Sequence, residues 1–315
     1  MPNWKECSGE KNWESLLKPL NKDLSETIIH YGKRVQAIYD TIDNDKFSPT
    51  YGHPKYKEEE FFSKVGLGLY TVKTYLWTNA KDVDFTKKVG DVWIGYVAVA
   101  TDEGKEKLGR RDIMVCWRGT LTLAEWINNL QVEHVKKYGL FCFQTSASPI
   151  LGSCSGNARV HKGFLSIYTH KLAREKVLKV VRELMDQYKN EEISITVSGH
   201  SLGSALATLN AADIVANEYN KPPGSNTTAM VTTFAFANPK VGNSGFTTVF
   251  NKLKNLHLLH VKHIRDPVPE LPHGNNYSKL GIVLTLNTTD PNSPLECHSL
   301  KYTLKAIEAT QVKLN

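Results

Sequence analysis

The sequence predicts one α/β domain whose mainly parallel sheet is covered by helices on both faces. β-Forming stretches alternate with helical stretches through the second half of the chain, which is the pattern of parallel strands joined by crossover helices. A chain of 315 residues can bury a large core, and no segment of disordered composition divides it. We therefore expect residues 1–315 to fold as a single domain.

The first part of the chain is expected to be helical and then to form a hairpin. Apolar residues recur with helical spacing, which predicts helices over 12–40 and 57–79. Residues 1–85 would thus be an N-terminal helical segment packed on the same core. Two β-forming stretches, 94–100 and 113–117, flank a charged turn and favour an antiparallel hairpin.

Residues 121–130 have the spacing of a short amphipathic helix, with Leu123, Trp126 and Ile127 on one face. The later elements alternate in type. We expect a helix over 164–189, a strand from 193, a helix over 202–219, a strand over 230–237, a helix over 246–253 and a strand over 256–264.

Composition and charge narrow the class of protein. The formal net charge is +7, but the 39 basic residues are spread among 32 acidic ones, which allows only weak attraction to anionic lipid surfaces. No basic helix or basic–aromatic stripe stands out, which disfavours nucleic-acid binding. No group of histidine, aspartate and cysteine has metal-ligand spacing, so we expect neither a metal nor a cofactor.

Three features favour a cytoplasmic location. The longest apolar run, 94–100, is too short to span a bilayer. Residues 1–13 are polar and lack the apolar core of a secretory signal. The five cysteines contain no C-x-x-C pair, so we expect free thiols in a reducing compartment.

The sequence GHSLG at 199–203 carries the strongest functional signal. It follows a β-forming stretch and precedes an alanine- and leucine-rich helix, and G-x-S-x-G in that setting is typical of a nucleophile elbow. We therefore expect Ser201 to be a catalytic nucleophile. Leu202 begins the helix, and its N–H is a candidate donor to an oxyanion. His200, inside the turn, is expected to support it.

A serine nucleophile needs a histidine base and a carboxylate that orients this base. The carboxylate should follow a strand beyond the elbow helix. Asp266 directly follows strand 256–264, whereas Asp213 lies inside the elbow helix and Asp290 lies in a turn. Asp266 is therefore the predicted acid, with an ordinary strand-end turn as the alternative.

His298 is the predicted base because it lies in a loop just before a C-terminal helix, a usual place for a catalytic histidine. His273 is closer to Asp266 in sequence but lies in a Pro/Gly loop. Structural or surface roles are expected for the histidines in or beside strand 256–264, which are His257, His260 and His263.

A second oxyanion donor is expected from Thr120. Strand 113–117 runs directly into the tight turn Arg-Gly-Thr, and Thr120 can offer both its N–H and its hydroxyl group. A plain strand-exit turn is the alternative.

These stretches together resemble the class 3 lipase family, and most closely its plant phospholipase A1 branch of the class II, cytosolic type. The resemblance extends from about Trp4 to Ala306. It rests on CWRGT (116–120), VHKGF (160–164), GHSLG (199–203), FANPKVGN (236–243), DPVPELP (266–272) and HSLKYTL (298–304). It implies an α/β-hydrolase fold in which Ser201, Asp266 and His298 form the triad and Thr120 and Leu202 are the oxyanion donors.

The resemblance also implies a substrate and a surface contact. A member of this branch would cleave the sn-1 ester of a glycerophospholipid through an acyl-serine, with galactolipids or triacylglycerols as further substrates. Residues 121–130 correspond to the family's lid, so Leu123, Trp126 and Ile127 would meet the acyl chain or a membrane surface. A core-facing helix is the alternative. Ser204 replaces a usual glycine and could crowd the elbow helix against the sheet.

Two other functions are compatible with this sequence. An esterase or acyltransferase acting on a soluble specialised metabolite would use the same acyl-serine, and activation by a lipid surface would separate the two functions. A non-catalytic α/β-hydrolase receptor would lack a triad residue, but all three are present here.

Overall fold

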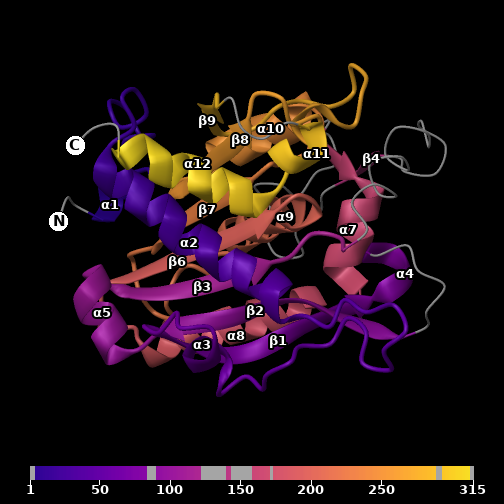
Figure 1. Cartoon of the computed structure of the whole chain (residues 1–315). Helices are drawn as coiled ribbons and strands as arrows, with labels where there is room; N and C mark the ends of the chain where they lie inside the picture. The colour runs from indigo at the N-terminus through magenta and orange to yellow at the C-terminus, as the bar shows by residue number, and fades with distance from the viewer. Residues whose placement is uncertain are drawn as a thin grey trace.

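A seven-stranded sheet forms the framework of the molecule. The computed structural model describes residues 4–83, 90–121, 140–142, 158–170, 173–288 and 293–312. The strands lie in the order β1-β2-β3-β6-β7-β8-β9, antiparallel from β1 to β3 and parallel from β3 to β9 (Figure 1). Their bounds are β1 Tyr70–Asn79, β2 Asp91–Ala100, β3 Arg111–Trp117, β6 Ile193–His200, β7 Met230–Phe236, β8 Leu256–His263 and β9 Ile282–Leu286. A separate antiparallel pair consists of β4 (Leu140–Cys142) and β5 (Arg159–His161).

Helices cover both faces of the sheet (Figure 1). One face packs on α7 (Lys162–Thr169), α8 (Ala173–Gln187), α9 (Leu202–Ala216) and α10 (Ser244–Lys252), and the opposite face packs on α2 (Lys22–Thr41) and α12 (Leu300–Val312). The shorter helices are α1 (Trp4–Cys7), α3 (Phe61–Lys64), α4 (Ala80–Val83), α5 (Asp102–Leu108) and α11 (Pro294–Cys297). The predicted α/β-hydrolase architecture is confirmed.

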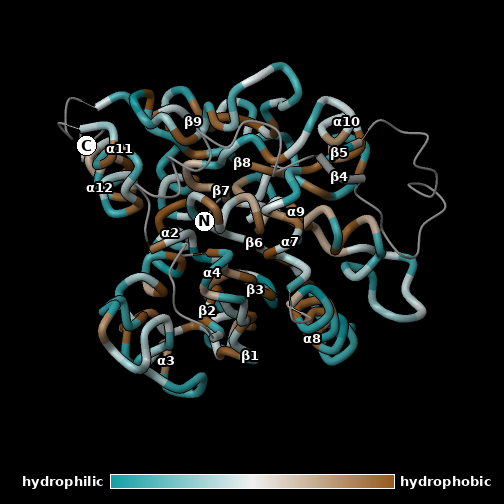
Figure 2. Tube along the Cα trace, turned by 90° about the vertical axis from the view of Figure 1, so that its right-hand side faces the viewer, coloured by the Kyte–Doolittle hydropathy of each residue, from teal (hydrophilic) through white to brown (hydrophobic). Residues whose placement is uncertain are grey.

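The alternation of side chains along the strands explains why both faces are covered. On β6, Ile195 and Val197 belong to the core beneath α8 and α9, and on β3, Met114 and Cys116 belong to the core beneath α2 and α12. Figure 2 shows the hydrophobic residues gathered along the strands and the hydrophilic ones prevailing in the peripheral loops. No helix of the described segments is both long and apolar enough to cross a membrane.

Helix α2 begins at a capping residue and packs through one apolar face. The side chain of Asn21 accepts hydrogen bonds from the N–H groups of Asp23 and Leu24, which otherwise have no acceptor within the helix. Ile28 and Val35 are fully buried on the face toward the sheet. The helix expected over 12–40 therefore starts only at Lys22, and residues 12–21 form turns.

The expectation of a helix over 57–79 is wrong. Only α3 is helical there, and residues 70–79 form β1, which pairs with β2 at the edge of the sheet. Tyr70 and Val72 are buried while Thr71 and Lys73 are exposed, so the burial has the period of a strand. The predicted N-terminal helical segment 1–85 thus includes an edge strand of the main sheet.

The predicted hairpin is confirmed in its antiparallel pairing, but its connection is α5 rather than a turn. Thr101 caps the start of α5, and Gly109 ends it with a φ of 74°, a conformation that suits glycine. The helix expected over 164–189 is two helices, α7 and α8, with α7 ending before His170. The helix expected over 121–130 lies outside the described residues, apart from its first residue.

Candidate active site

Ser201 lies in a strained turn between β6 and α9. Its φ of 58° and ψ of −128° are rarely adopted by a residue with a side chain, and such strain costs of order 1–3 kcal/mol. The parallel strands on both sides of β6 hold this turn in place, and the N–H of Ser201 donates to the carbonyl of Phe236 on β7 at 2.9 Å. The local structure is the nucleophile elbow that the GHSLG motif predicts.

Two glycines make the elbow sterically possible. A Cβ atom on Gly199 would lie 2.1 Å from the carbonyl oxygen of Gly203, and one on Gly203 would lie 2.3 Å from the carbonyl oxygen of Trp117. Both distances are far below van der Waals contact, so any side chain at either position would push α9 away from the sheet. The glycines therefore allow strand, turn and helix to pass close to one another.

Asp266 and His298 come together although 32 residues separate them. His298 Nδ1 lies 3.0 Å and 2.9 Å from the two carboxylate oxygens of Asp266, and both side chains are buried. The N–H of Val268 also donates to the Asp266 carboxylate at 3.0 Å. A carboxylate can only accept, so His298 carries its proton on Nδ1 and presents a lone pair on Nε2.

The remaining donor and acceptor of the predicted triad are Ser201 Oγ and His298 Nε2. Both atoms are buried, and neither has a hydrogen-bond partner within the described part of the chain. The His298 ring lies 4.7 Å, between centroids, from the ring of His200, the neighbour of Ser201. A hydroxyl without an acceptor and an imidazole nitrogen without a donor form the pair that base-assisted attack requires.

The Arg-Gly-Thr turn after β3 lies against the elbow. A Cβ atom on Gly119 would lie 2.7 Å from the carbonyl oxygen of His200 and 3.0 Å from Ser201 Cβ. The Arg118 guanidinium is buried and anchors the turn by donating to the carbonyl of Trp93 at 2.6 Å. Thr120 is also buried and is the next residue after Gly119. On the other side of the elbow, Leu202 is the first residue of α9, and its N–H therefore has no acceptor within the helix.

The other aspartates and histidines considered as acid or base lie in different surroundings. Asp213 is buried and accepts a hydrogen bond from Tyr168 at 2.8 Å, so it forms part of the packing between α7 and α9. His260 accepts from the N–H of Asn238, and His273 is exposed. Asp290 lies outside the described residues, as do the expected lid residues Leu123, Trp126 and Ile127.

Ser204 fits into the elbow helix without crowding the sheet. Its hydroxyl donates to the carbonyl of Ser201 at 2.6 Å and lies 2.9 Å from the side-chain oxygen of Asn238. The close passage between helix and sheet is made by Gly199 and Gly203 instead. The departure from the family's usual glycine therefore adds a buried hydrogen bond to the turn.

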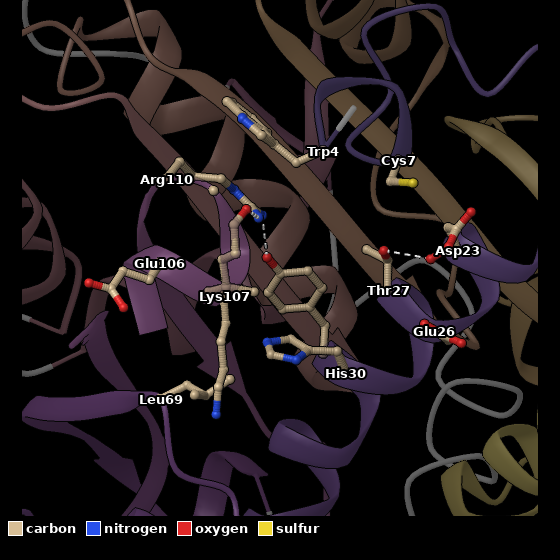
Figure 3. A pocket seen from close by; sticks show the side chains of 13 residues that line it. Trp4, Cys7, Asp23, Glu26, Thr27, His30, Leu69, Glu106, Lys107 and Arg110 are labelled. Atoms are coloured by element: carbon tan, nitrogen blue, oxygen red, sulfur yellow. Dashed lines mark hydrogen bonds between the residues drawn. The ribbon is translucent and has the colours of Figure 1, made fainter. Parts of the chain in front are cut away.

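A separate pocket of about 530 Å³ lies at the opposite end of the sheet (Figure 3). Trp4, His30 and Arg110 are among the residues that line it. Arg110 precedes β3 at its amino end, whereas Ser201 follows the carboxyl end of the parallel neighbour β6. The length of β3 separates the two by roughly 20 Å, so the pocket is distinct from the candidate active site. No group of three potential metal ligands occurs among the described residues.

The fold and this geometry define an α/β-hydrolase with a serine at the elbow and a carboxylate-bound histidine near it. Residues 114–276 match the model of the family described as lipase (class 3). Phospholipase A1-II 6 of Oryza sativa subsp. japonica is 38% identical, over 96% of this chain and 80% of that protein. Phospholipase A1-IIgamma of Arabidopsis thaliana is 35% identical, over 98% of this chain and 79% of that protein.

The chain belongs to the class 3 lipase family, in its plant phospholipase A1-II branch, and is a carboxylic ester hydrolase. The nonglycosylated LIP2 lipase of Yarrowia lipolytica has a similar fold, with a TM-score of 0.61 and 19% identity over 88% of this chain and 84% of that one. The family membership predicted from the motifs is confirmed.

Proposed function

We propose that this protein hydrolyses the sn-1 ester of glycerophospholipids through an acyl intermediate on Ser201. The observation that carries the proposal is the buried Asp266–His298 pair, which leaves the Nε2 lone pair of His298 to accept the proton of a serine held in a strained elbow. The choice of substrate is supported by the relatives, which are named phospholipases A1.

The mechanism follows from the roles of these groups. Ser201 Oγ attacks the ester carbonyl while His298 Nε2 takes the hydroxyl proton, and Asp266 stabilises the imidazolium that forms. The N–H of Leu202 and the donors of Thr120 stabilise the oxyanion. His298 then gives its proton to the leaving lysophospholipid hydroxyl. In the second half, His298 takes a proton from water, which attacks the acyl-serine. His298 then returns this proton to Ser201 Oγ as the bond to the acyl group breaks and the fatty acid leaves.

Peripheral contact with a lipid surface is part of the proposal. Ile264 is 58% exposed and Leu295 is 51% exposed, and they precede the acid Asp266 and the base His298 by two and three residues. Exposed aliphatic side chains beside the catalytic loops can enter the interfacial layer of a lipid aggregate.

The test is fatty-acid release from phosphatidylcholine vesicles labelled separately at sn-1 and sn-2, for the wild type and for Ser201→Ala. We expect selective sn-1 release that falls at least ~10⁴-fold in the variant. The variant Ile264→Ser/Leu295→Ser should lose vesicle hydrolysis but keep hydrolysis of a soluble short-chain ester. If the wild type cleaves only the soluble ester, the lipid assignment fails and a soluble ester or acyl acceptor is the substrate. If release is unchanged in Ser201→Ala, the serine mechanism fails.

We also propose that the protein works in the cytoplasm. The described cysteines Cys7, Cys116 and Cys297 are buried free thiols, which suits a reducing compartment. A fluorescent fusion expressed in plant cells tests the location. Secretion of the fusion would contradict it, as would glycosylation at Asn226, which lies in the acceptor sequence Asn-Thr-Thr.

A further inference from the structure

Three hydrogen bonds in sequence join helix α2 to the groups around Ser201. The N–H of Gly119 donates to Tyr39 Oη at 2.7 Å, Tyr39 Oη lies 3.0 Å from His200 Nδ1, and His200 Nε2 lies 2.7 Å from the carbonyl oxygen of His298. The series connects the turn that precedes Thr120, the residue before Ser201 and the backbone of the base. Tyr39 is half-buried near the C-terminal end of α2, outside the segment that matches the family model.

The direction of every proton in this series is determined by the groups at its two ends, the N–H of Gly119, which can only donate, and the carbonyl of His298, which can only accept. The carbonyl oxygen of His298 can only accept, so His200 carries a proton on Nε2. In a neutral imidazole the other nitrogen, Nδ1, is then an acceptor, and it takes the hydroxyl proton of Tyr39. Tyr39 Oη in turn accepts from the backbone N–H of Gly119. The three bonds are therefore mutually consistent in only one arrangement.

The surroundings keep His200 neutral, which this arrangement requires. Burial, followed by the neighbouring His298, lowers the pKa of His200 to about 3. His200 is thus an uncharged link at neutral pH, and its tautomer stays fixed. A protonated His200 would offer a second donor to Tyr39 and would place a positive charge beside the imidazolium of His298 during catalysis.

We propose that Tyr39 is a positioning residue for hydrolysis at Ser201, since it fixes the Gly119 turn and the orientation of His200 at the same time. The inference rests on the proposed acyl-hydrolase function. Tyr39 holds the oxyanion turn against the elbow through the Gly119 N–H, and it holds the backbone of His298 through His200. Loss of the hydroxyl alone would displace the Thr120 donor and the base relative to Ser201 without removing either.

The variant Tyr39→Phe tests this role because it keeps the ring and removes only the hydroxyl. Complete loss of an oxyanion donor lowers the rate ~10²–10³-fold, so a displaced but retained donor should lower kcat about tenfold. The readout is kcat and KM on a soluble short-chain ester, together with the affinity for a trifluoromethyl ketone that mimics the tetrahedral intermediate. We expect KM to stay within twofold and the affinity for the ketone to fall in step with kcat/KM.

Tyr31→Phe is the matched control on the same helix. Tyr31 Oη donates to Asp112 at 3.0 Å and accepts from Arg110 at 2.8 Å, and Tyr31 lines the pocket at the opposite end of the sheet. The same substitution there removes hydrogen bonds that are fully buried but distant from Ser201. We expect Tyr31→Phe to lower Tm at least as much as Tyr39→Phe while leaving kcat within twofold.

A double-mutant cycle with His200→Gln separates a connected series from two independent contacts. The glutamine amide can still donate to the His298 carbonyl, but its acceptor Oε1 lies one bond further from the backbone than Nδ1 and does not take the position from which Nδ1 accepts from Tyr39. If Tyr39 acts through His200, the double variant should be no slower than the slower single variant. Unchanged kcat in a folded Tyr39→Phe, or an equal loss in Tyr31→Phe, would overturn the inference. If the wild type shows no Ser201-dependent hydrolysis at all, the proposed function fails instead.

Discussion

At the scale of single residues, chemistry depends on which atom carries each proton. The Asp266 carboxylate accepts from His298 Nδ1 and thereby keeps the Nε2 lone pair directed away from itself. His200 has the opposite tautomer, with its proton on Nε2, because its acceptor is a carbonyl oxygen. Two adjacent imidazoles therefore have different tautomers. That of His298 leaves Nε2 free to accept, as the proposed base requires, and that of His200 makes it a structural link.

Asp266→Asn should lower kcat about 10⁴-fold with little change in fold, as expected when a triad aspartate is replaced by its amide. The asparagine amide group can donate to Nδ1 and would favour the tautomer with the proton on Nε2, which cannot accept from Ser201. Steady-state kinetics on a soluble ester measure kcat, and circular dichroism is the folding control. A loss of less than tenfold would mean that Asp266 is not the orienting acid.

At the scale of elements, the elbow depends on the close passage of β3, β6 and α9. Gly203 is pressed against the backbone of Trp117 and Arg118 at the end of β3, and Gly199 is pressed against Gly203 itself. Helix α2 lies on the other face and reaches the same end of the sheet with Tyr39. The site is therefore held between two helical layers, and a change in helix-to-sheet distance reaches Ser201 directly.

Gly203→Ala should destabilise the fold by about 1–3 kcal/mol, because the new methyl group would lie 2.3 Å from a carbonyl oxygen and force α9 outward. The loss of kcat should exceed what the loss of folded protein explains, since Leu202 and Ser201 move with the helix. Gly68→Ala is the control, as a Cβ there meets nothing within 4 Å. Urea unfolding and ester kinetics report both effects, and equal behaviour of the two variants would contradict the elbow packing.

At the scale of the whole molecule, burial of neutral histidines links stability to pH. Burial lowers the pKa of His200 and His260 to about 3 and that of His161 to about 4. In the unfolded chain the pKa of a histidine is about 6.5, so the unfolded state binds protons first as the pH falls. Stability is complete above about pH 6.5 and decreases toward the folded pKa values.

Lowering the pH from 7 to 5 should lower the free energy of unfolding by about 2 kcal/mol for each of these histidines. The measurement is urea unfolding at both pH values for the wild type and for His260→Gln, which should lose the contribution of one proton. His273→Gln is the control, because it makes the same replacement at an exposed histidine. Identical pH dependence in all three proteins would show that His260 is not held neutral.

Local patterns in the sequence are enough to predict the catalytic chemistry. GHSLG after a β-forming stretch predicts the elbow, because strand, tight turn and helix are contiguous, and Asp266 and His298 follow from their places after a strand and before a helix. Features that depend on contacts between distant segments become visible in the folded protein alone. Residues 70–79 become a strand because β2 supplies its hydrogen-bond partners, and no motif around Tyr39 indicates that α2 brings its hydroxyl between Gly119 and His200. Tyr39 is 80 positions from Gly119 and 161 positions from His200, and hydrogen bonds over such distances produce no periodic pattern in the sequence. These bonds form because the sheet places all three residues at the same end.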